Sequence, residues 1–572
     1  MKINLLDRLV CACSATIRSL RTNFRAASTI SCLTALGLSC TPAAAQDVRI
    51  EHVIVVSPER SLPMRDATVY IHDDRIVSIS PARSVEARRS KTNAEVIDGH
   101  GLYLSPGLID SHVHTNDVPG MTTEQEQAHP DIASATREQI PRSYLYFGFT
   151  TLIDLISTPA AIAQWNAREI HPDIYFCGGA PIVDGYPMNW APKPQRYRPF
   201  PYMIVQRGEE SSAPEGIDPA SHTPEAVVSR MKADGALCVK SFYERGFGDD
   251  QTIPVPRLDT IRALVQAAHA AKMPVFLHAN GSDAQAFALE AGVDIIAHGL
   301  WHWNGEPKTA TELTPAVTKI LDHVLQTQVG WQPTMQVLYG ERDLFDPAYL
   351  SDPILLQVLP ANYIAWCRSP EGQWFHQILS DAILPKPTAE SKIAESKTAE
   401  SKDTAAQWSA ARSFYSAPMA RHRNTTNYLA THGARLLFGT DTPSAPTYAN
   451  PPGLNGWMEM HKLIDAGLTP GQIFRAATIV NAQALGLDGE IGTVQPGKRA
   501  NLLLLRKDPT QTVDAYNDIV KVILRGRVID RAELAANRIT DGARHGTQWR
   551  PGAGFGLSGA VLEIRDRNVP TD

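Results

Sequence analysis

The chain has 572 residues, of which 43% are hydrophobic and 20% are charged, and its formal net charge is -6. This length allows one large domain and a smaller second one, and the composition is that of an ordinary globular protein. The net negative charge gives no reason to expect nucleic acid as a partner.

The first 45 residues have the pattern of a secretory signal peptide. Five basic residues precede an apolar stretch at 26–40, and small residues follow at 43–45. We therefore predict that residues 1–45 are cleaved and that the protein is exported, with the periplasm as its expected location. A membrane anchor is the alternative, but the apolar run is short and broken by Thr and Ser, so no stable anchor is expected. A lipid-modified Cys40 is a weaker alternative, because Gly37 stands where such signals usually have an aliphatic residue.

Cysteines are scarce in the part of the chain that follows the leader. They are Cys177, Cys238 and Cys367. Because they are widely spaced, we expect no disulfide framework, even in an oxidising compartment. The hydrophobic core is therefore expected to stabilise the fold.

Short β-rich runs occupy both ends of the mature chain. Residues 48–104 alternate such runs with Pro and Asp-Asp turns, and residues 500–529 have a similar pattern. We predict one small β-sandwich domain built from both terminal segments. Its halves are residues 46–104 and 491–545, and a tail follows at 546–572.

Residues 105–490 alternate strand patterns with helix patterns. This alternation is typical of an α/β fold with parallel strands, and we predict a (β/α)8 TIM-like barrel. Two segments interrupt it. Residues 178–202 are rich in Pro, Tyr and Trp and are expected to form a pocket wall or lid. A five-residue repeat at 388–402 lies in a low-complexity insertion at 385–405, which we expect to be solvated and without a catalytic part.

Six residues of metal-binding character each stand at the end of a short apolar run: His112, His114, Lys240, His278, His298 and Asp441. If each run is a barrel strand, the six side chains meet on one face. Imidazole and carboxylate groups suit borderline divalent metals such as Zn²⁺. Each residue alone also has a plainer explanation, as a buried histidine, a turn aspartate or a lysine at a strand end.

The chain resembles the amidohydrolase superfamily from about residue 50 to about residue 530. The motif Pro-Gly-Leu-Ile-Asp-x-His-x-His, which ends at His114, carries this resemblance, as do residues 468–505. The segment from His278 to Gly299 is most similar to the imidazolonepropionase-related and prolidase-like branch. The resemblance implies a barrel joined to a small β-sandwich and a metal-dependent hydrolase.

The resemblance also implies a role for each of the six residues. They would hold two divalent metals, with zinc the first candidate, and His278 and His298 would hold the second one. Lys240 would react with carbon dioxide to give a carbamate that bridges the metals. Asp441 would be both a ligand and the general base that takes a proton from the shared water. Asp110, on the same side of its strand as the histidines, is expected to hold a ligand in place.

Four further residues are candidates to bind the substrate: Tyr243, His302, Tyr339 and Arg342. The tyrosines and Arg342 could contact a substrate carboxylate. His302, between Trp301 and Trp303, could line the pocket or pack within a loop, and the sequence leaves both interpretations open.

The expected activity is metal-dependent hydrolysis of an amide C–N bond in a small molecule: a peptide-like substrate, an N-acyl amino acid or a cyclic amide. Related deaminases have a Glu where this chain has Gly281 and lack the bridging lysine, so deamination is less expected. Ester, lactone or phosphotriester hydrolysis at the same site is an alternative. An exported binding protein without catalysis is another, although no ligand position is substituted. The sequence leaves open whether the chain forms a homo-oligomer.

Overall fold

The computed structural model describes residues 47–82, 94–190, 195–247, 251–384, 400–444 and 446–536. The predicted signal peptide, the predicted tail at 546–572 and most of the predicted insertion at 385–405 lie outside these residues. Glu400 begins a helix, so the end of that insertion is helical rather than irregular. Within the described ranges, no helix is both long and apolar enough to cross a membrane.

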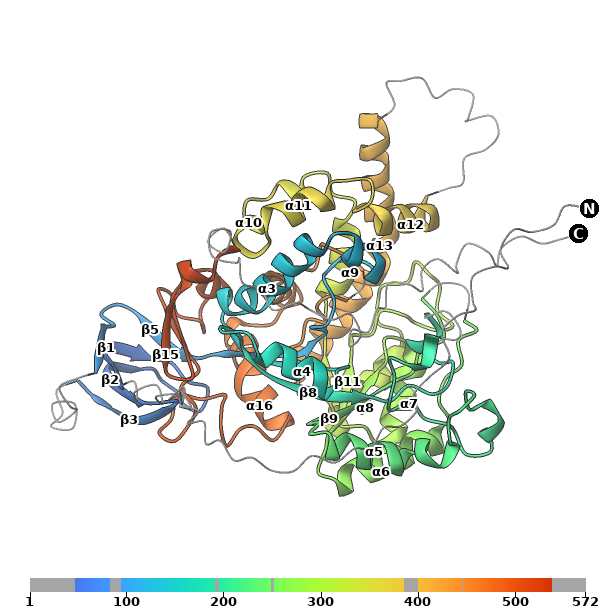
Figure 1. Cartoon of the computed structure of the whole chain (residues 1–572), viewed down its shortest axis with the longest axis horizontal. Coiled ribbons are helices and arrows are strands. Elements are labelled where there is room, and N and C mark those ends of the chain that lie inside the picture. The colour runs from blue at the N-terminus through green and yellow to red at the C-terminus, as the bar shows by residue number, and fades with distance from the viewer. Residues whose placement is uncertain are drawn as a thin grey trace, which may run out of the picture. The chain divides into compact units, whose positions relative to one another are not determined.

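Both ends of the described chain contribute to one eight-stranded sheet (Figure 1). Its strands run in the order β15 (Arg527–Asp530), β14 (Ile519–Leu524), β13 (Leu502–Leu505), β5 (Tyr103–Pro106), β1 (Asp47–Val55), β2 (Met64–His72) and β3 (Arg75–Pro81), and β4 (Glu95–Asp98) pairs with β1. The antiparallel pair β5–β13 joins the two terminal segments. The prediction that both ends share one small β domain is therefore confirmed, whereas its packing as a sandwich stays a prediction.

Alternation of apolar residues explains how this sheet makes its own core. In β1, Val48 and Ile50 are buried, and after a slip in the pairing with β2 the buried positions become Val53 and Val55. Successive side chains of a strand point to opposite faces, so each pair lies on one face. Leu504 of β13 belongs to the same buried cluster, which therefore includes both ends of the chain.

A second sheet consists of seven parallel strands in chain order. They are β6 (Leu108–Val113), β7 (Phe149–Asp154), β8 (Asp173–Gly179), β9 (Cys238–Phe242), β10 (Val275–His278), β11 (Ile295–Ala297) and β12 (Gly330–Gln332). The segment 436–442 bridges both edges, because Leu436 pairs with Trp331 of β12 and Thr442 pairs with Val113 of β6. The sheet therefore curls round in the manner of the predicted TIM-like barrel.

Helices connect the barrel strands and extend beyond them (Figure 1). Between β6 and β12 the chain forms α2 (Thr123–Ala128), α3 (Pro130–Tyr146), α4 (Pro159–Asn166), α5 (Pro224–Ala233), α6 (Leu258–Ala270), α7 (Ser282–Ala291) and α8 (Pro315–Thr327). After β12 come α9 (Gln336–Asp343), α10 (Leu355–Val358), α11 (Ala361–Cys367), α12 (Trp374–Ile383) and α13 (Glu400–Thr431). The helices α14 (Leu454–Asp465), α15 (Pro470–Arg475) and α16 (Asn481–Ala484) precede β13.

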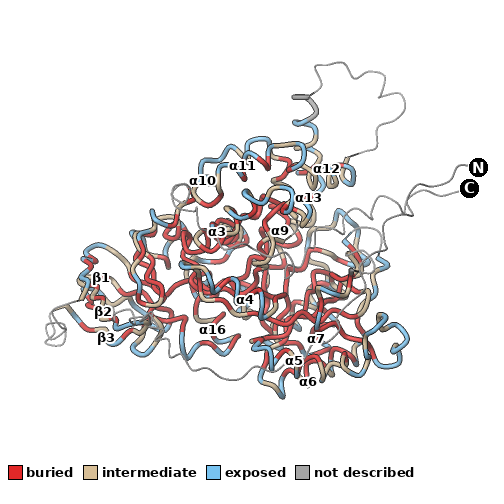
Figure 2. Tube along the Cα trace, viewed as in Figure 1, coloured by how far each residue is buried: buried red, intermediate tan, exposed pale blue. Residues whose placement is uncertain are grey.

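The barrel strands contribute an apolar layer of buried side chains. Figure 2 shows that much of the chain in the middle of the molecule is buried. The members of the layer from the strands and the closing segment are Ile109, Ile153, Cys177, Cys238, Phe276, Ile295 and Leu437, all in one buried cluster. Cys238 and Phe276 each stand two residues before a ligand candidate and so face the same side of their strand. The layer therefore supports the ligand candidates from inside the barrel.

Within this layer, Cys177 of β8 and Cys238 of β9 form a disulfide bond. The expectation of no disulfide framework did not foresee this single bond. They are 61 residues apart in sequence, but they lie opposite each other in the parallel pair β8–β9. Barrel topology brings them together, and the spacing of cysteines along a sequence does not reveal such a pair. Cys367 is buried and free.

Asp173, at the start of β8, joins the barrel to the terminal sheet. Its Oδ1 accepts a hydrogen bond from Arg525 Nη1 at 2.8 Å, and its Oδ2 accepts from Arg499 Nη1 at 2.9 Å and from Asn501 Nδ2 at 2.7 Å. Burial alone would raise the pKa of Asp173, but the two arginines outweigh it and hold the pKa below its ordinary value.

Asp173→Asn is expected to lower the free energy of unfolding by about 2–3 kcal/mol at pH 7, less than for a fully buried pair because the arginines are partly exposed. The depressed pKa makes this stabilisation complete above the unfolded pKa, about 3.9, and lost as the pH falls through the folded pKa. Denaturant titrations at pH 7, 5 and 3.5 should give a constant difference between the first two and a smaller one at the third. Glu169→Gln, which breaks an exposed pair with Arg527, should cost below about 1 kcal/mol. A difference that does not depend on pH would contradict this account.

Candidate metal centre

Five of the six ligand candidates lie at or just after the carboxyl ends of barrel strands or in the closing segment, and Lys240 is the central residue of β9. His112 and Lys240 are within β6 and β9, His278 ends β10, and His114, His298 and Asp441 follow strand residues directly or lie in the closing segment. In a parallel barrel this face carries the loops on which catalytic groups are placed.

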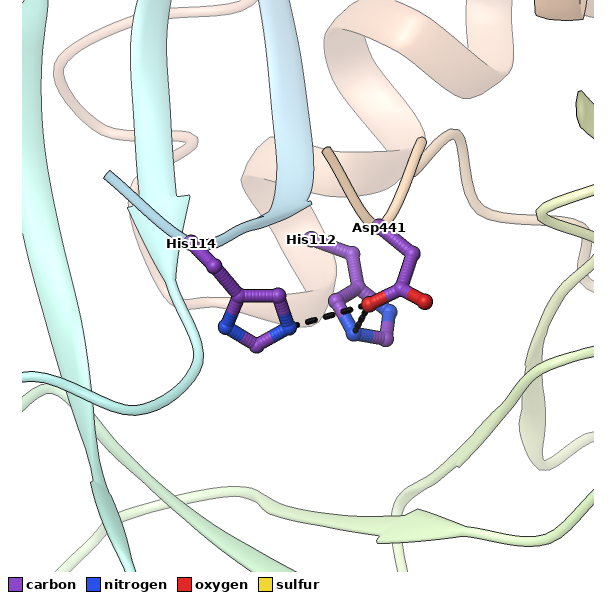
Figure 3. A group of neighbouring side chains, drawn as sticks. All are labelled: His112, His114 and Asp441. Carbon is purple, nitrogen blue, oxygen red and sulfur yellow. Dashed lines mark hydrogen bonds and ion pairs between the residues drawn. The ribbon is translucent and has the colours of Figure 1, made fainter. Parts of the chain in front are cut away.

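His112, His114 and Asp441 form the tightest part of the group (Figure 3). Nε2 of each histidine lies 2.9 Å from Asp441 Oδ1, and one ligand atom from each residue lies within 4.8 Å of the others. His112 Nε2 is buried and, despite its distance from Asp441, makes no hydrogen bond among the described residues. Two imidazoles and a carboxylate arranged in this way fit a divalent metal ion.

His278 and His298 extend the group from β10 and β11. Their ring centroids are 4.5 Å apart, and the ring of His298 lies 4.9 Å from that of His112. His298 Nδ1 is 4.0 Å from Asp441 Oδ2. The four imidazoles therefore form a continuous set with Asp441.

Lys240 is buried beside this set. Its Nζ has no hydrogen-bond partner among the described residues, and the side chain is only 1% exposed. Burial lowers the pKa of Lys240 to about 7, against the opposing effect of Asp441. A large fraction of the amine is therefore neutral near pH 7, and the neutral amine is the form that can react with carbon dioxide.

Each of three ligand histidines is oriented by a hydrogen bond at its other ring nitrogen. The contacts are His112 Nδ1 to Gln332 Oε1 at 3.1 Å, His298 Nδ1 to Thr334 Oγ1 at 3.0 Å, and His278 Nε2 to Glu244 Oε2 at 3.1 Å. These contacts leave Nε2 of His112 and His298, and Nδ1 of His278, for a metal. The sequence reasoning missed all three partners. Gln332 and Thr334 could have been suspected, since they are polar residues at the end of a predicted barrel strand.

The protonation of these rings also suits ligation. Burial lowers the pKa of His112 to about 3 and moves those of His278 and His298 below the ordinary value. These imidazoles are therefore neutral at pH 7, which is the form that binds metals.

Asp110 does not hydrogen-bond to the imidazole ring of a ligand candidate among the described residues; it binds Thr440 and the backbone N–H of His112 instead. Its Oδ2 accepts a hydrogen bond from Thr440 Oγ1 at 2.7 Å, and its Oδ1 accepts from the backbone N–H groups of Thr440 and His112 at 3.1 and 3.2 Å. It thereby ties the end of β6 to the segment that carries Asp441.

Aromatic side chains surround His278. The ring of Tyr186 lies 4.7 Å from that of His278, and those of Phe247 and Phe242 lie at 6.2 and 6.3 Å. Tyr186 also contacts Trp190 at 4.9 Å. Tyr186 and Trp190 belong to the segment 178–202, which therefore contacts the ligand group as a pocket wall would.

Of the four substrate-binding candidates, His302 is the one beside the ligand group. Burial lowers its pKa, and the charges of Glu244 and His278 act on it. Its ring lies 6.2 Å from that of Trp301, which in turn lies 5.9 Å from that of His298.

The structure does not bring the other three candidates to the ligands. The ring of Tyr243 packs 4.7 Å from that of Phe287 in α7, and its hydroxyl accepts a hydrogen bond from Arg245. Arg342 pairs with Asp343, and its guanidinium lies 4.9 Å from the ring centre of Tyr339. Tyr243 N donates a backbone hydrogen bond of 3.0 Å to the carbonyl oxygen of His278. No side-chain hydrogen bond or ion pair joins these three residues to the ligand candidates in the part of the chain that is described, so their role in binding a substrate carboxylate stays a prediction.

Curated relatives share parts of the sequence. A dihydroorotase of Solibacter usitatus is 24% identical over 237 residues, which are 41% of this chain and 43% of that protein. An imidazolonepropionase of Stenotrophomonas maltophilia is 37% identical over 121 residues, 21% of this chain and 27% of that protein. The matches thus span less than half the length of these curated relatives.

Solved structures share the fold. A Xaa-Pro dipeptidase with bound methionine has a TM-score of 0.57 and 17% sequence identity, over 85% of this chain and 100% of that one. The A. niger ochratoxinase has a TM-score of 0.57 and 15% identity, over 85% of this chain and 96% of that one.

The model of the Amidohydrolase family matches residues 103–300 and 375–529. These ranges hold all six ligand candidates, the barrel strands up to β11, the closing segment and β13 and β14 of the terminal sheet. Since they make up more than half of the chain, the protein belongs to the amidohydrolase family.

Proposed function

We propose that this protein is a metal-dependent hydrolase that cleaves an amide C–N bond in a peptide-like substrate, an N-acyl amino acid or a cyclic amide. The convergence of four imidazoles, Asp441 and an unpartnered Lys240 at one end of the barrel carries this proposal. Family membership supports it, as do relatives named dihydroorotase and imidazolonepropionase, which act on carbon–nitrogen bonds.

The donor set fits two divalent metals, for which zinc is the first candidate. His112, His114 and Asp441 would hold one and His278 and His298 the other, with a carbamate of Lys240 between them. Such metals, when bound, lower the pKa of a water molecule and polarise a carbonyl group. Two observations support this fit: His112 Nε2 is buried beside Asp441 Oδ1 without a hydrogen bond, and the buried Nζ of Lys240 lacks a hydrogen-bond partner.

The side chains at the site would accept a proton during the reaction and limit the access of water to it. Burial alone would raise the pKa of Asp441, but its contacts with His112, His298 and His114 outweigh it and hold this pKa well below its ordinary value. The hydrogen bond between His114 Nε2 and Asp441 Oδ1 favours the carboxylate even where the ring is neutral. Asp441 is thus an ionised carboxylate, with Oδ1 placed to accept a proton at the centre of the group. The aromatic rings over His278 would limit the access of water to the bond being cleaved.

We propose in addition that the protein is exported, as its first 45 residues predict. A disulfide inside the barrel supports this proposal, because structural disulfides persist in oxidising compartments and are rare in the cytosol.

Metal content and activity test the proposed function together. Protein purified without chelator should contain about two equivalents of divalent metal. After equilibration with ¹³C-bicarbonate it should give a carbamate signal in ¹³C NMR that Lys240→Arg lacks. The metal-replete protein should turn over some members of a panel of dipeptides, N-acyl amino acids and cyclic amides.

Aryl esters and lactones belong on the same panel as controls. Turnover of these alone would overturn the proposal of amide cleavage. About one equivalent of metal, with no carbamate signal, would replace the two-metal site by a mononuclear one.

A further inference from the structure

Glu341 is a carboxylate of α9 to which the proposed function assigns no role. It lies in α9, which follows β12 and therefore starts at the carboxyl face of the barrel. Its Oε2 accepts a hydrogen bond of 3.0 Å from the hydroxyl of Tyr415 in α13. Tyr415 packs with Trp301, and the ring of Trp301 lies 5.9 Å from that of His298.

Electrostatic interactions link Glu341 to the ligand group. The charge of Asp441 acts on Glu341, and the charge of Glu341 acts on the hydroxyl of Tyr186. Tyr186 is the residue whose ring covers His278. Glu341 therefore shares the electrostatic environment of the metal ligands and of the aromatic wall.

Glu341 has no positively charged partner among the described residues. No arginine, lysine or histidine forms an ion pair with it, and the charged group that acts on it is another carboxylate. Burial raises the pKa of Glu341 to about 7. Two residues further along α9, Asp343 is paired with Arg342 in the ordinary way.

Glu341 is partly buried, and a carboxylate that is partly withdrawn from water is normally paired with a cation. Near an active site, the missing partner can belong to the substrate. The hydroxyl of Tyr415 donates a hydrogen bond to Oε2 of Glu341, and Oε1 has no hydrogen-bond partner among the described residues. One oxygen is thus held in place while the other stays available.

We propose that Glu341 binds a positive charge on the substrate, so that the preferred substrates are amides with a protonated amine or guanidinium near the scissile bond. This inference rests on the proposed function and names the substrate class. Tyr415 acts as a positioning residue that fixes the carboxylate.

Binding measurements with matched probes test the proposal directly. The first pair is N-acetyl-L-lysine and N-acetyl-L-norleucine, which differ in the side-chain ammonium. The second is a dipeptide with a free amino terminus and its N-formyl derivative. Calorimetry on the metal-replete protein should show that the cationic member of at least one pair binds about 10–100-fold more tightly. Glu341→Gln should abolish this preference.

Asp343→Asn is the matched control, since it removes the same charge from the same helix where that charge already has a partner. It should keep the preference of the wild type. Tyr415→Phe should reduce the preference without abolishing it, because the carboxylate stays but loses its fixed orientation. Circular dichroism and metal content should show that all three variants fold and bind metal.

Two outcomes would overturn the inference: the wild type binds both members of each pair equally, or Glu341→Gln keeps the preference. Turnover of the amide panel without a cation preference would leave the proposed function standing and remove this inference. A cation preference in binding, without turnover of any amide, would support this inference and remove the proposed function.

Discussion

Replacing Asp441 by asparagine is expected to lower kcat by about 10²–10⁴-fold, the usual cost of losing a general acid–base group. Asp441 is the carboxylate among the six ligand candidates, and its Oδ1 lies 2.9 Å from both His112 and His114. Asparagine keeps the size and one ligand oxygen but removes the basic one. Because the histidines and Lys240 are unchanged, at least one metal should stay bound. Steady-state kinetics with elemental analysis of the same sample measures both quantities.

The matched control is Asp154→Asn, at the end of β7. Asp154 is buried like Asp441, but its oxygens accept hydrogen bonds from Thr115 and from the backbone of Ile156. Its loss should lower the melting temperature and leave kcat within about tenfold of the wild type. A nearly normal kcat in metal-replete Asp441→Asn would exclude Asp441 as the base. The proton acceptor would then be sought first at His302.

The ligand group could be predicted because its signals are local. Each of the six residues ends a short apolar run in the sequence. Because parallel strands of a barrel end on one face, these residues are predicted to lie close together. The helix before β10 could be predicted from a local signal as well. The apolar residues from Leu258 to Ala271 have helical spacing, and the structure has α6 at Leu258–Ala270.

The partners of the ligands could not be predicted in the same way. Gln332 lies 220 residues from His112, and Glu244 lies 34 residues from His278. Polar residues of these types are common, and only the register of neighbouring strands decides which of them meet. Glu341 was missed for a related reason, since the direction of α9 depends on packing against α13.

Strand alternation could have corrected one substrate-binding candidate. Lys240 and Tyr243 are three residues apart, so in an extended strand their side chains face opposite sides. With Lys240 inside the barrel, Tyr243 must face the helices, where it packs on Phe287. Arg342 pairs with its neighbour Asp343 in the structure. The sequence shows that the two residues are adjacent, but adjacency alone does not establish that their side chains meet.

The disulfide offers the second large effect, this time on stability. Cys177→Ala combined with Cys238→Ala is expected to lower the free energy of unfolding by about 2–4 kcal/mol. The chain-entropy model gives about 4 kcal/mol for a loop of this length, and observed effects are often smaller. Denaturant titrations of the wild type with and without reductant should show a similar loss. Cys367→Ala, which removes a buried sulfur outside any disulfide, is the control for the cavity alone.

The same double variant should also weaken the metal centre, because Cys238 stands two residues before Lys240 on the same face of β9. The bond to Cys177 fixes β9 against β8 directly beneath the lysine. Without it, metal titrations should show a lower affinity and a smaller carbamate signal, whereas Cys367→Ala should match the wild type. If the double variant lost stability but kept full affinity, the disulfide would stabilise the barrel only. If it lost neither, the apolar layer would hold Lys240 in place without a covalent link.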